Sequence, residues 1–385
     1  MMRRTINNMP GVRGWIVLMA GVLMLGLAAC DGGVEPELDT SGVPNGPTDD
    51  PPDPTNGCIV PTNLFADGGV GKDGIPALTN PPLVDASQIT YLADDSRVIG
   101  FLVDGNAVAV PHNILWWHEI INFSFSSARL AVTYCPLTGS SMAFNRASAG
   151  GGEFGVSGLL FQNNLTMYDR TSDESLWPQM NRQAGCGARV GTQLEMFPVV
   201  EMTWAGWQSL HPGTKVVSEN TGHDRNYTPD GYPYGDYELP NNPSLLFRMP
   251  IDERRLPKER LLGIPNLEGG IAFPFFELDE EGSVRAVHET VAGESVVVFW
   301  DRARVGAMAY RPVHDGQPLT FEARDDRLFD VETGSAWRLD GRAVEGPLAG
   351  ERLEPVAEAY VAFWFAWAAF QPQTRLWESG SCCVP

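Results

Sequence analysis

The chain has 385 residues, of which 48 are acidic and 27 basic, so its formal net charge at neutral pH is −21. A surface this negative repels phosphate backbones, which argues against nucleic acid as a partner. The length is sufficient for two domains, each with its own core.

The N-terminus has the features of a secretory signal peptide. An apolar run from Trp15 to Leu27 follows a positive region, whose charges are those of Arg3, Arg4 and Arg13. The run is shorter than the roughly 20 residues that a membrane-spanning helix needs. It ends in Leu27-Ala28-Ala29-Cys30, which resembles the lipobox of bacterial lipoproteins. We therefore expect residues 1–29 to be a signal peptide that is removed, and Cys30 to be lipidated.

Residues 30–57 are predicted to form a disordered tether. From Asp31 to Gly57 the sequence holds seven acids, six prolines and no base, so it cannot bury enough apolar surface to offset chain entropy. The predicted location is the bacterial cell envelope, with the protein anchored by its N-terminal lipid and facing the periplasm or the exterior. The membrane is thus a predicted partner, and the sequence identifies no protein or small-molecule partner.

An internal repeat divides the remaining chain into two halves. Three pairs of segments keep the same order and nearly the same offset, namely Val98–Pro111 with Leu261–Pro274, Leu165–Trp177 with Asp326–Trp337, and Thr203–Thr214 with Phe363–Thr374. The constant register predicts a tandem duplication. Its parts are a first β-rich lobe over 58–220, a connecting loop rich in Tyr, Pro and Asp over 221–259, and a second, degenerate β-rich lobe over 260–385.

Most segments within each half are predicted to be strands, because alternating or β-branched runs are bounded by turn residues. The clearest are Val98–Val103, Ala107–Val110, Leu130–Tyr134 and Val296–Trp300. Asp104-Gly105 predicts a hairpin turn. One helix is predicted after Pro111, and one Trp-containing helix in each half, over Thr203–Leu210 and Phe363–Phe370. The predicted class is α+β and dominated by sheet.

Five cysteines besides Cys30 would lie in an oxidising compartment. Cys58 and Cys186 have turn residues as neighbours, and Cys382 and Cys383 lie together near the end of the sequence. Adjacent cysteines rarely bond each other. We therefore expect two disulfides that join Cys58 and Cys186 to Cys382 and Cys383, in either order. Cys135 remains as the odd thiol.

Cys135 is the main candidate for a reactive residue. It ends a predicted strand in V-T-Y-C-P-L-T-G-S-S, where a polar turn would present the thiol at the mouth of a pocket. His112, His118 and Met142 are candidate partners of Cys135 in a soft-metal site, since these residue types suit copper or zinc. The alternative is that Cys135 is buried and inert. For His118 the alternative is a buried, hydrogen-bonded side chain on an apolar helix face.

The second half lacks these side chains. Phe275 stands opposite His112, Glu281 opposite His118, and a position near Asp301 opposite Cys135. Residues kept in both halves are expected to serve the shared fold, and residues kept in one half are candidates for function. This comparison predicts that the first half carries the site.

Several segments resemble the hallmark motifs of the domain-of-unknown-function 3179 family. They are P-H-N-I-L-W-W-H-E-I-I-N, V-T-Y-C-P-L-T-G-S-S, F-G-V-S-G-L-L, M-Y-D-R-T-S-D-E-S-L-W and F-W-F-A-W-A-A-F. The resemblance covers roughly Asp73 to Trp377 and implies a related fold, but no established reaction. Many members of the family have C-P-L-C at the central turn, whereas here Thr138 occupies the second cysteine position. The resemblance therefore does not imply an intact redox or metal site that uses two cysteines.

Two classes of function follow from these observations. The first is an envelope lipoprotein that uses Cys135 and nearby histidines for soft-metal binding or thiol chemistry, with enzymatic activity left open. The second is a non-catalytic ligand-binding or scaffold module of the cell envelope, in which Cys135 is merely packed. Metal content and thiol reactivity would separate the two.

Overall fold

The computed structural model describes residues 57–171, 174–280 and 282–380. The expected signal peptide, Cys30, all but the last residue of the tether, Cys382 and Cys383 lie outside these ranges. No helix within them is long and apolar enough to cross a membrane. Strands dominate the described chain, which confirms the sheet-dominated α+β class.

The first half contains a five-stranded sheet of order β13-β4-β5-β14-β3. Its strands are β13 (Val200–Thr203), β4 (Arg97–Val103), β5 (Asn106–Pro111), β14 (Lys215–Val217) and β3 (Leu83–Asp85). The β14–β5 pair is parallel and the other pairs are antiparallel. Asp104 and Gly105 join β4 to β5 with φ values of 50° and 74°, as a two-residue hairpin turn requires. The predicted hairpin is confirmed.

A nine-stranded sheet contains strands of both halves. Its main path is β2 (Leu78–Thr79), β6 (Ile120–Ser124), β7 (Arg129–Cys135), β8 (Ser140–Asn145), β27 (Tyr360–Phe363), β15 (Arg260–Ile264), β16 (Ile271–Pro274) and β28 (Arg375–Leu376), and β12 (Glu195–Met196) pairs with β8. The two halves meet where β8 pairs with β27, at Ser141 and Val361. They therefore share hydrogen-bonded sheet and are not separate bodies.

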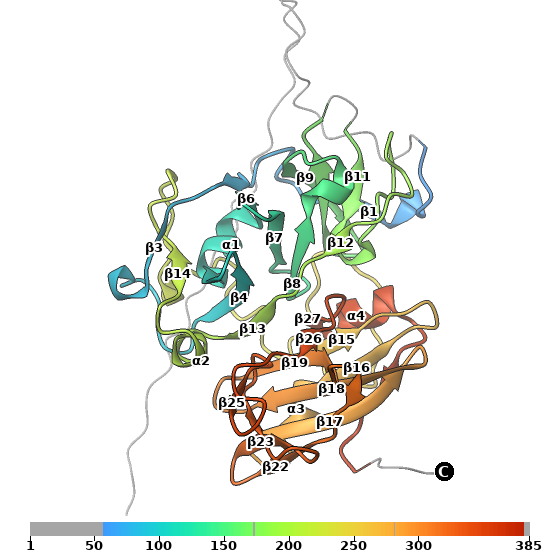
Figure 1. Cartoon of the computed structure of the whole chain (residues 1–385). Coiled ribbons are helices and arrows are strands. Elements are labelled where there is room, and N and C mark those ends of the chain that lie inside the picture. Colours follow the sequence, from blue (N-terminus) through green and yellow to red (C-terminus); the bar gives the residue numbers. More distant parts are fainter. Residues whose placement is uncertain (1–56, 172–173, 281, 381–385) are drawn as a thin grey trace, which may run out of the picture. The chain divides into compact units, whose positions relative to one another are not determined.

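The path β27-β15-β16-β28 repeats the path β13-β4-β5-β14, including the parallel pair at its end. Helix α2 (Trp204–Leu210) follows β13 and helix α4 (Trp364–Phe370) follows β27, so both predicted Trp-containing helices are present (Figure 1). Helices α1 (His112–His118) and α3 (Phe275–Leu278) follow β5 and β16 in the same way. This is the topology that the sequence repeat predicts, and common ancestry of the halves stays a prediction.

Each half also places one hairpin turn against a strand of the other half. The turn between β7 and β8 accepts a hydrogen bond from Phe363 of the second half, whose N–H lies 2.8 Å from the Thr138 carbonyl. In return, Thr203 of the first half donates its N–H to the Arg304 carbonyl at 2.9 Å. Arg304 lies in the turn between β18 (Glu294–Asp301) and β19 (Gly306–Arg311). Each of these two turns is thus covered by residues that are far away in the sequence.

Smaller sheets complete the described chain. One contains β1 (Phe65–Asp67), β9 (Phe154–Phe161), β10 (Asn164–Asp169) and β11 (Leu176–Pro178), and another contains β17 (Val284–Val291), β18, β19 and β26 (Glu354–Pro355). The others are the pair β20 (Val313–His314) and β21 (Gln317–Pro318), and the four-stranded β22 (Phe321–Arg324), β23 (Arg327–Asp330), β24 (Ala336–Trp337) and β25 (Ala343–Glu345). Short 3-10 helices occur at Thr62–Leu64, Ala86–Gln88, Arg146–Ala149, Gln179–Asn181 and Pro229–Gly231.

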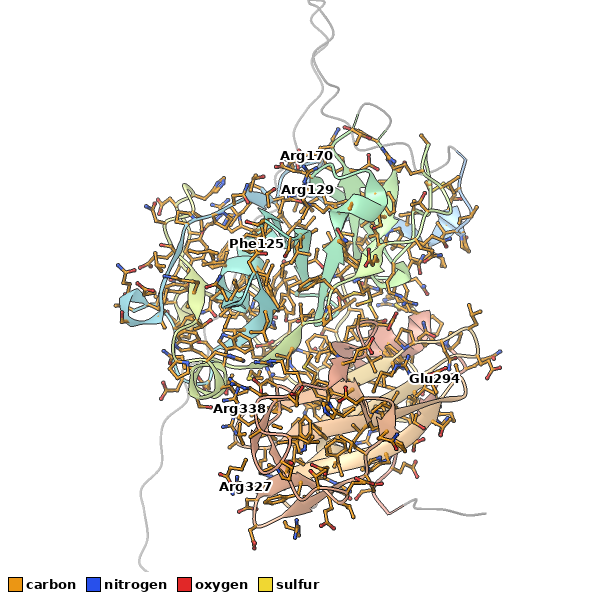
Figure 2. All side chains as sticks on the ribbon, viewed as in Figure 1. Phe125, Arg129, Arg170, Glu294, Arg327 and Arg338 are labelled. Carbon is orange, nitrogen blue, oxygen red and sulfur yellow. A yellow bond between two sulfur atoms is a disulfide. The ribbon has the colours of Figure 1, made fainter. Side chains whose placement is uncertain are left out.

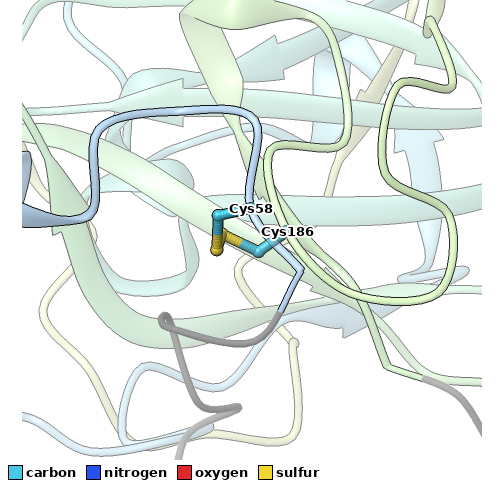
Figure 3. Close-up of a disulfide and its surroundings, with 2 residues drawn as sticks. All are labelled: Cys58 and Cys186. Atoms are coloured by element: carbon cyan, nitrogen blue, oxygen red, sulfur yellow. A yellow bond between two sulfur atoms is a disulfide. The ribbon is translucent and has the colours of Figure 1, made fainter.

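Cys58 and Cys186 form a disulfide with each other (Figure 3). The predicted pairing of these two residues with Cys382 and Cys383 is therefore wrong. The sequence suggested bonds to the end of the chain because all four cysteines have turn neighbours. In the structure, the Ile59 N–H donates to the Gly185 carbonyl at 2.9 Å, so the start of the described chain already lies beside the loop that carries Cys186.

Candidate functional site

Cys135 is a free thiol, as predicted, but it is not at the mouth of a pocket. It is the last residue of β7, it is 0% exposed, and its Sγ accepts a hydrogen bond from the Leu165 N–H at 3.3 Å. Burial raises the pKa of the Cys135 thiol to about 11. The turn after it is covered by Phe363, whose ring packs against Gly139, and by Tyr237, whose hydroxyl donates to the Leu137 carbonyl. The expected exposed and activated thiol is therefore wrong.

The four candidate metal ligands do not converge on one point. Met142 packs in the same apolar cluster as Cys135, on one face of the β7–β8 hairpin. His112 lies on the other face, where its ring stacks on Tyr134 with the centroids 3.9 Å apart. The alternation of side chains along a strand separates them, because Tyr134 directly precedes Cys135. Within the described ranges, no group of three or more His, Cys, Asp or Glu side chains could hold a metal ion.

His118 takes the alternative role that the sequence left open. Its side chain is 0% exposed, its Nδ1 lies 2.7 Å from the Pro76 carbonyl, and its Nε2 lies 2.7 Å from the Tyr227 hydroxyl. Desolvation lowers its pKa to about 4, so the ring is neutral at pH 7. Both ring nitrogens are occupied by protein partners, as in a structural histidine.

The structure instead assembles a buried ionic cluster around Glu201 of β13. Arg97 donates to Glu201 Oε1 at 3.1 Å, and Arg260 donates to the same oxygen at 2.9 Å. The Ser141 hydroxyl donates to Glu201 Oε2 at 2.5 Å. The Glu201 side chain is completely buried, whereas the side chains of the pair Arg327 and Glu345 are 43% and 64% exposed. Figure 2 shows Arg327 at the edge of the molecule. One buried carboxylate therefore pairs with two guanidinium groups.

The two arginines come from equivalent positions of the two halves. Arg97 pairs with Thr203 in the register of β4 with β13, and Arg260 pairs with Phe363 in the register of β15 with β27. Each pairing lies at the start of the Trp-containing helix that follows. Only the first half supplies a carboxylate, because the position of Glu201 in β13 is occupied by Val361 in β27.

The protonation states in this cluster follow from burial and charge. Burial alone would raise the pKa of Glu201, but Arg260 and its other neighbours outweigh this effect and hold it at about 2. Desolvation lowers the pKa of His112 to about 3 despite the nearby Glu201. Glu201 is therefore ionised and His112 neutral at pH 7.

Ser141, His112 and Glu201 do not form a nucleophilic triad. In a triad, the histidine accepts the serine proton with one ring nitrogen and is held by the acid through the other. Here the Ser141 hydroxyl donates its hydrogen bond to Glu201, and a single atom, His112 Nε2, faces both the Ser141 hydroxyl at 3.2 Å and Glu201 Oε2 at 3.5 Å. The arrangement positions charges and does not activate the hydroxyl.

Arg97, His112 and Arg260 line a cavity of about 550 Å³. Its walls come from the first half, from the connecting segment and from the second half. The lining comprises Asp95, Ser96, Arg97, His112, Trp116, Pro229, Glu238, Leu239, Pro240, Lys258, Arg260, Phe275, Phe276, Asp279, Trp300, Arg302 and Val305. Five lining residues come from the first half, five from the connecting segment and seven from the second half, whereas the sequence predicted a site in the first half.

The comparison with protein families decides the identity of the chain. The family model described as "Protein of unknown function (DUF3179)" matches residues 72–374. The chain belongs to this family. The match covers both halves and every residue that lines the cavity. No curated protein and no solved structure matches the chain.

In this DUF3179 chain, Thr138 of the turn after Cys135 lies in a buried polar network. Thr138 is 0% exposed, its hydroxyl lies 2.9 Å from the Ser140 hydroxyl, and it accepts a hydrogen bond from the Asn164 amide at 2.9 Å. Gln179 closes the network by accepting from Ser140 at 2.5 Å. The threonine hydroxyl is therefore paired inside the protein.

Sequence reasoning missed the Glu201 cluster although one signal for it was present. Arg97 and Arg260 are separated by the same offset as the repeat, and each lies one residue before a repeated segment. Because residues kept in both halves are expected to serve the shared fold, these two arginines did not qualify as candidates for function. No local pattern identified Glu201, because it lies in a short strand between apolar residues.

Proposed function

We propose that this protein is a non-catalytic binding module of the bacterial cell envelope that holds a small organic anion between the two halves of its chain. The observation that carries the proposal is the meeting of Arg97 and Arg260 in one cavity, with Glu201 as the carboxylate that they share. A planar guanidinium group presents a fork of N–H donors that matches a carboxylate.

Both guanidinium groups can be reached from the cavity. The Arg97 side chain retains 21% of its exposure and the Arg260 side chain 12%. Arg260 also pairs at 3.0 Å with Glu238, which lies on the connecting segment and is itself 37% exposed. An incoming anion can therefore replace a partly solvated carboxylate on Arg260 while Glu201 stays in place.

Lys258 supplies a third cation without a carboxylate partner. Its Nζ donates to the carbonyls of Asn242 at 2.9 Å and Ser244 at 2.6 Å, and lies 3.7 Å from the centroid of the Tyr237 ring. Within the described ranges no acidic side chain forms an ion pair with it, and burial lowers its pKa to about 8 although the charge of Asp236 acts in the opposite direction. An anion in the cavity would provide a countercharge and favour the protonated amine.

The charge of the lining differs from that of the chain as a whole. The chain has 48 acids and 27 bases, whereas the cavity is lined by four bases and three acids. The bases are Arg97, Lys258, Arg260 and Arg302, and the acids are Asp95, Glu238 and Asp279. Glu201, which pairs with two of these bases from behind the lining, brings the acids to four, so the site as a whole is close to neutral. In a protein with a net charge of −21, such a site repels an anion less than the rest of the surface does.

The location in the envelope is part of the proposal and has its support in the N-terminal sequence. A lipid on Cys30, as Leu27-Ala28-Ala29-Cys30 predicts, would keep the protein at a membrane. The extended acidic tether would separate the cavity from the lipid surface. The other function class, thiol or soft-metal chemistry at Cys135, has less support because the thiol is buried and its pKa is raised.

Calorimetric titration of the full-length protein with small anions tests the proposal. Acetate, 3-phenylpropionate and inorganic phosphate are suitable first probes. Arg97→Gln and Arg260→Gln should each weaken binding by roughly tenfold or more, because a hydrogen bond to a charged group contributes about 1.5–3 kcal/mol. Arg327→Gln removes a cation from an exposed pair outside the cavity and should bind as the wild type does.

Two results would reject the proposal. One is the absence of heat for every anion at millimolar concentration. The other is unchanged affinity in both cavity arginine variants, provided that circular dichroism shows each variant to be folded.

A further inference from the structure

We infer that the anion is an amphiphilic monocarboxylate, whose carboxylate lies at Arg97 and Arg260 and whose aromatic or aliphatic body lies at the cavity mouth. This inference rests on the proposed anion-binding function. It specifies that the ligand carries a single charge and that its uncharged part is apolar.

The cavity changes character from its interior to its mouth. In the interior, His112 and Trp300 are each 2% exposed, and His112 lies close enough to Arg97 and Arg260 to interact with their charges. At the mouth, Leu239 is 51% exposed and Phe276 is 50% exposed. Single exposed apolar side chains are common on proteins, but these two border the same cavity. A ligand with an apolar body would cover both of them.

Aromatic side chains of both halves line the cavity. Phe275 is buried and packs against Trp300, with ring centroids 4.9 Å apart, and it directly precedes Phe276 in helix α3. On the side of the first half, Trp116 packs edge-on against Tyr232 at 5.0 Å. Flat aromatic surfaces on two sides provide contact area for a ring or an alkyl chain.

The charges at the mouth argue against a second anionic group on the ligand. Arg302 is already paired with Asp279, at 2.6 Å between Nε and Oδ1, and both side chains are partly exposed. Asp95 is also exposed at the mouth. Because Arg302 and Asp279 compensate each other, Asp95 leaves these three residues with a net negative charge, which would repel the outer charge of a ligand with anions at both ends. A single charge at the inner end avoids this cost.

Calorimetry with a matched set of probes on the full-length protein tests the inference. The set comprises 3-phenylpropionate and octanoate as amphiphilic acids, acetate as the head group alone, 3-phenylpropan-1-ol as the body alone, and inorganic phosphate as a multiply charged anion without a body. The amphiphilic acids should bind about tenfold or more tightly than each of the others, since they gain both the ionic contact and apolar burial. The fluorescence of Trp116 and Trp300 should respond to the same probes.

A variant at the mouth provides the specific test. Phe276→Ser should weaken 3-phenylpropionate by about tenfold and leave acetate unchanged, because only the first probe reaches the mouth. Leu267→Ser is the matched control, because Leu267 is fully exposed and does not line this cavity. It should bind both probes as the wild type does.

The outcomes separate this inference from the proposed function. If phosphate or acetate binds as tightly as 3-phenylpropionate, or if Phe276→Ser has no effect on 3-phenylpropionate, the amphiphilic ligand is rejected and anion binding stands, provided that the arginine variants still weaken it. If no anion binds, both conclusions fail together.

Discussion

The two halves of the chain share a sheet order and differ in the polar side chains that they carry. Both halves place an arginine at the start of the strand before the hairpin, Arg97 in β4 and Arg260 in β15. Only the first half supplies Glu201, and the second has Val361 at the same register position. The result is two guanidinium groups for one fully buried carboxylate. In the proposed binding site, an arginine present in both halves thus meets a carboxylate present in only one of them.

Other repeated positions serve the fold alone. The Trp207 indole donates to the Thr214 hydroxyl at 2.8 Å, and Trp367 donates to Thr374 at 2.9 Å. The same hydrogen bond therefore fixes each Trp-containing helix to the chain that follows it. Agreement between the halves does not by itself distinguish structural from functional positions, and the partner of each side chain has to be known.

The largest effect is expected from making the first half resemble the second at the shared carboxylate. Glu201→Val copies Val361 and leaves Arg97 and Arg260 without their common partner in a buried site. Removing one side of a buried ionic pair typically costs about 3–5 kcal/mol. Urea denaturation should show a loss of this size in the free energy of unfolding.

Glu238→Gln is the control for this experiment. Glu238 also pairs with Arg260, but its side chain is 37% exposed, and exposed pairs contribute about 0–1 kcal/mol. If both variants lose the same small amount, Glu201 is not the structural centre of the cluster.

Local sequence patterns were sufficient for the elements and insufficient for the site. The predicted strands at Val98–Val103 and Leu130–Tyr134 correspond to β4 and β7, each within one residue at either end. Side-chain periodicity and turn residues determine these elements within a few residues. Whether the turn after Cys135 is exposed depends on Phe363, which is more than two hundred residues away in the sequence. No local pattern contains that information.

The second prediction compares two glycines that should be equally sensitive to substitution. A Cβ at Gly100 would lie 2.4 Å from the Trp207 ring, and a Cβ at Gly263 would lie 2.2 Å from the Trp367 ring. Gly100→Ala and Gly263→Ala should each cost about 1–3 kcal/mol through overpacking. A large loss in one variant and none in the other would show that the halves are not packed alike.

The third prediction concerns acid and His112, one of several first-half histidines with a lowered pKa. His112 is the one that Phe275 replaces in the second half. The pKa of His112 is about 3 in the folded protein, against roughly 6.5 in an unfolded chain. Between these values the unfolded chain binds more protons than the folded one. The stability is therefore complete above about pH 6.5 and falls as the pH decreases toward 3.

Urea midpoints measured from pH 7.5 down to pH 4.5 should reveal this fall. His112→Phe copies Phe275 of the second half and removes the titrating group, so its midpoint should depend less on pH over the same range. An equal pH dependence in wild type and variant would assign the effect to other groups.

The smallest effect is expected at Cys135. This thiol is completely buried and its pKa is raised to about 11, so iodoacetamide at pH 7.5 should label its peptide only after denaturation. Cys135→Ser should cost about 1 kcal/mol, because the serine hydroxyl can still accept the Leu165 N–H while a small void is left. The labelling has to be read on the peptide that contains Cys135, since other cysteines lie outside the described residues. Rapid labelling of that peptide in the native protein would restore thiol chemistry as a function of the first half, and would mean that the cover formed by Phe363 and Tyr237 opens in solution.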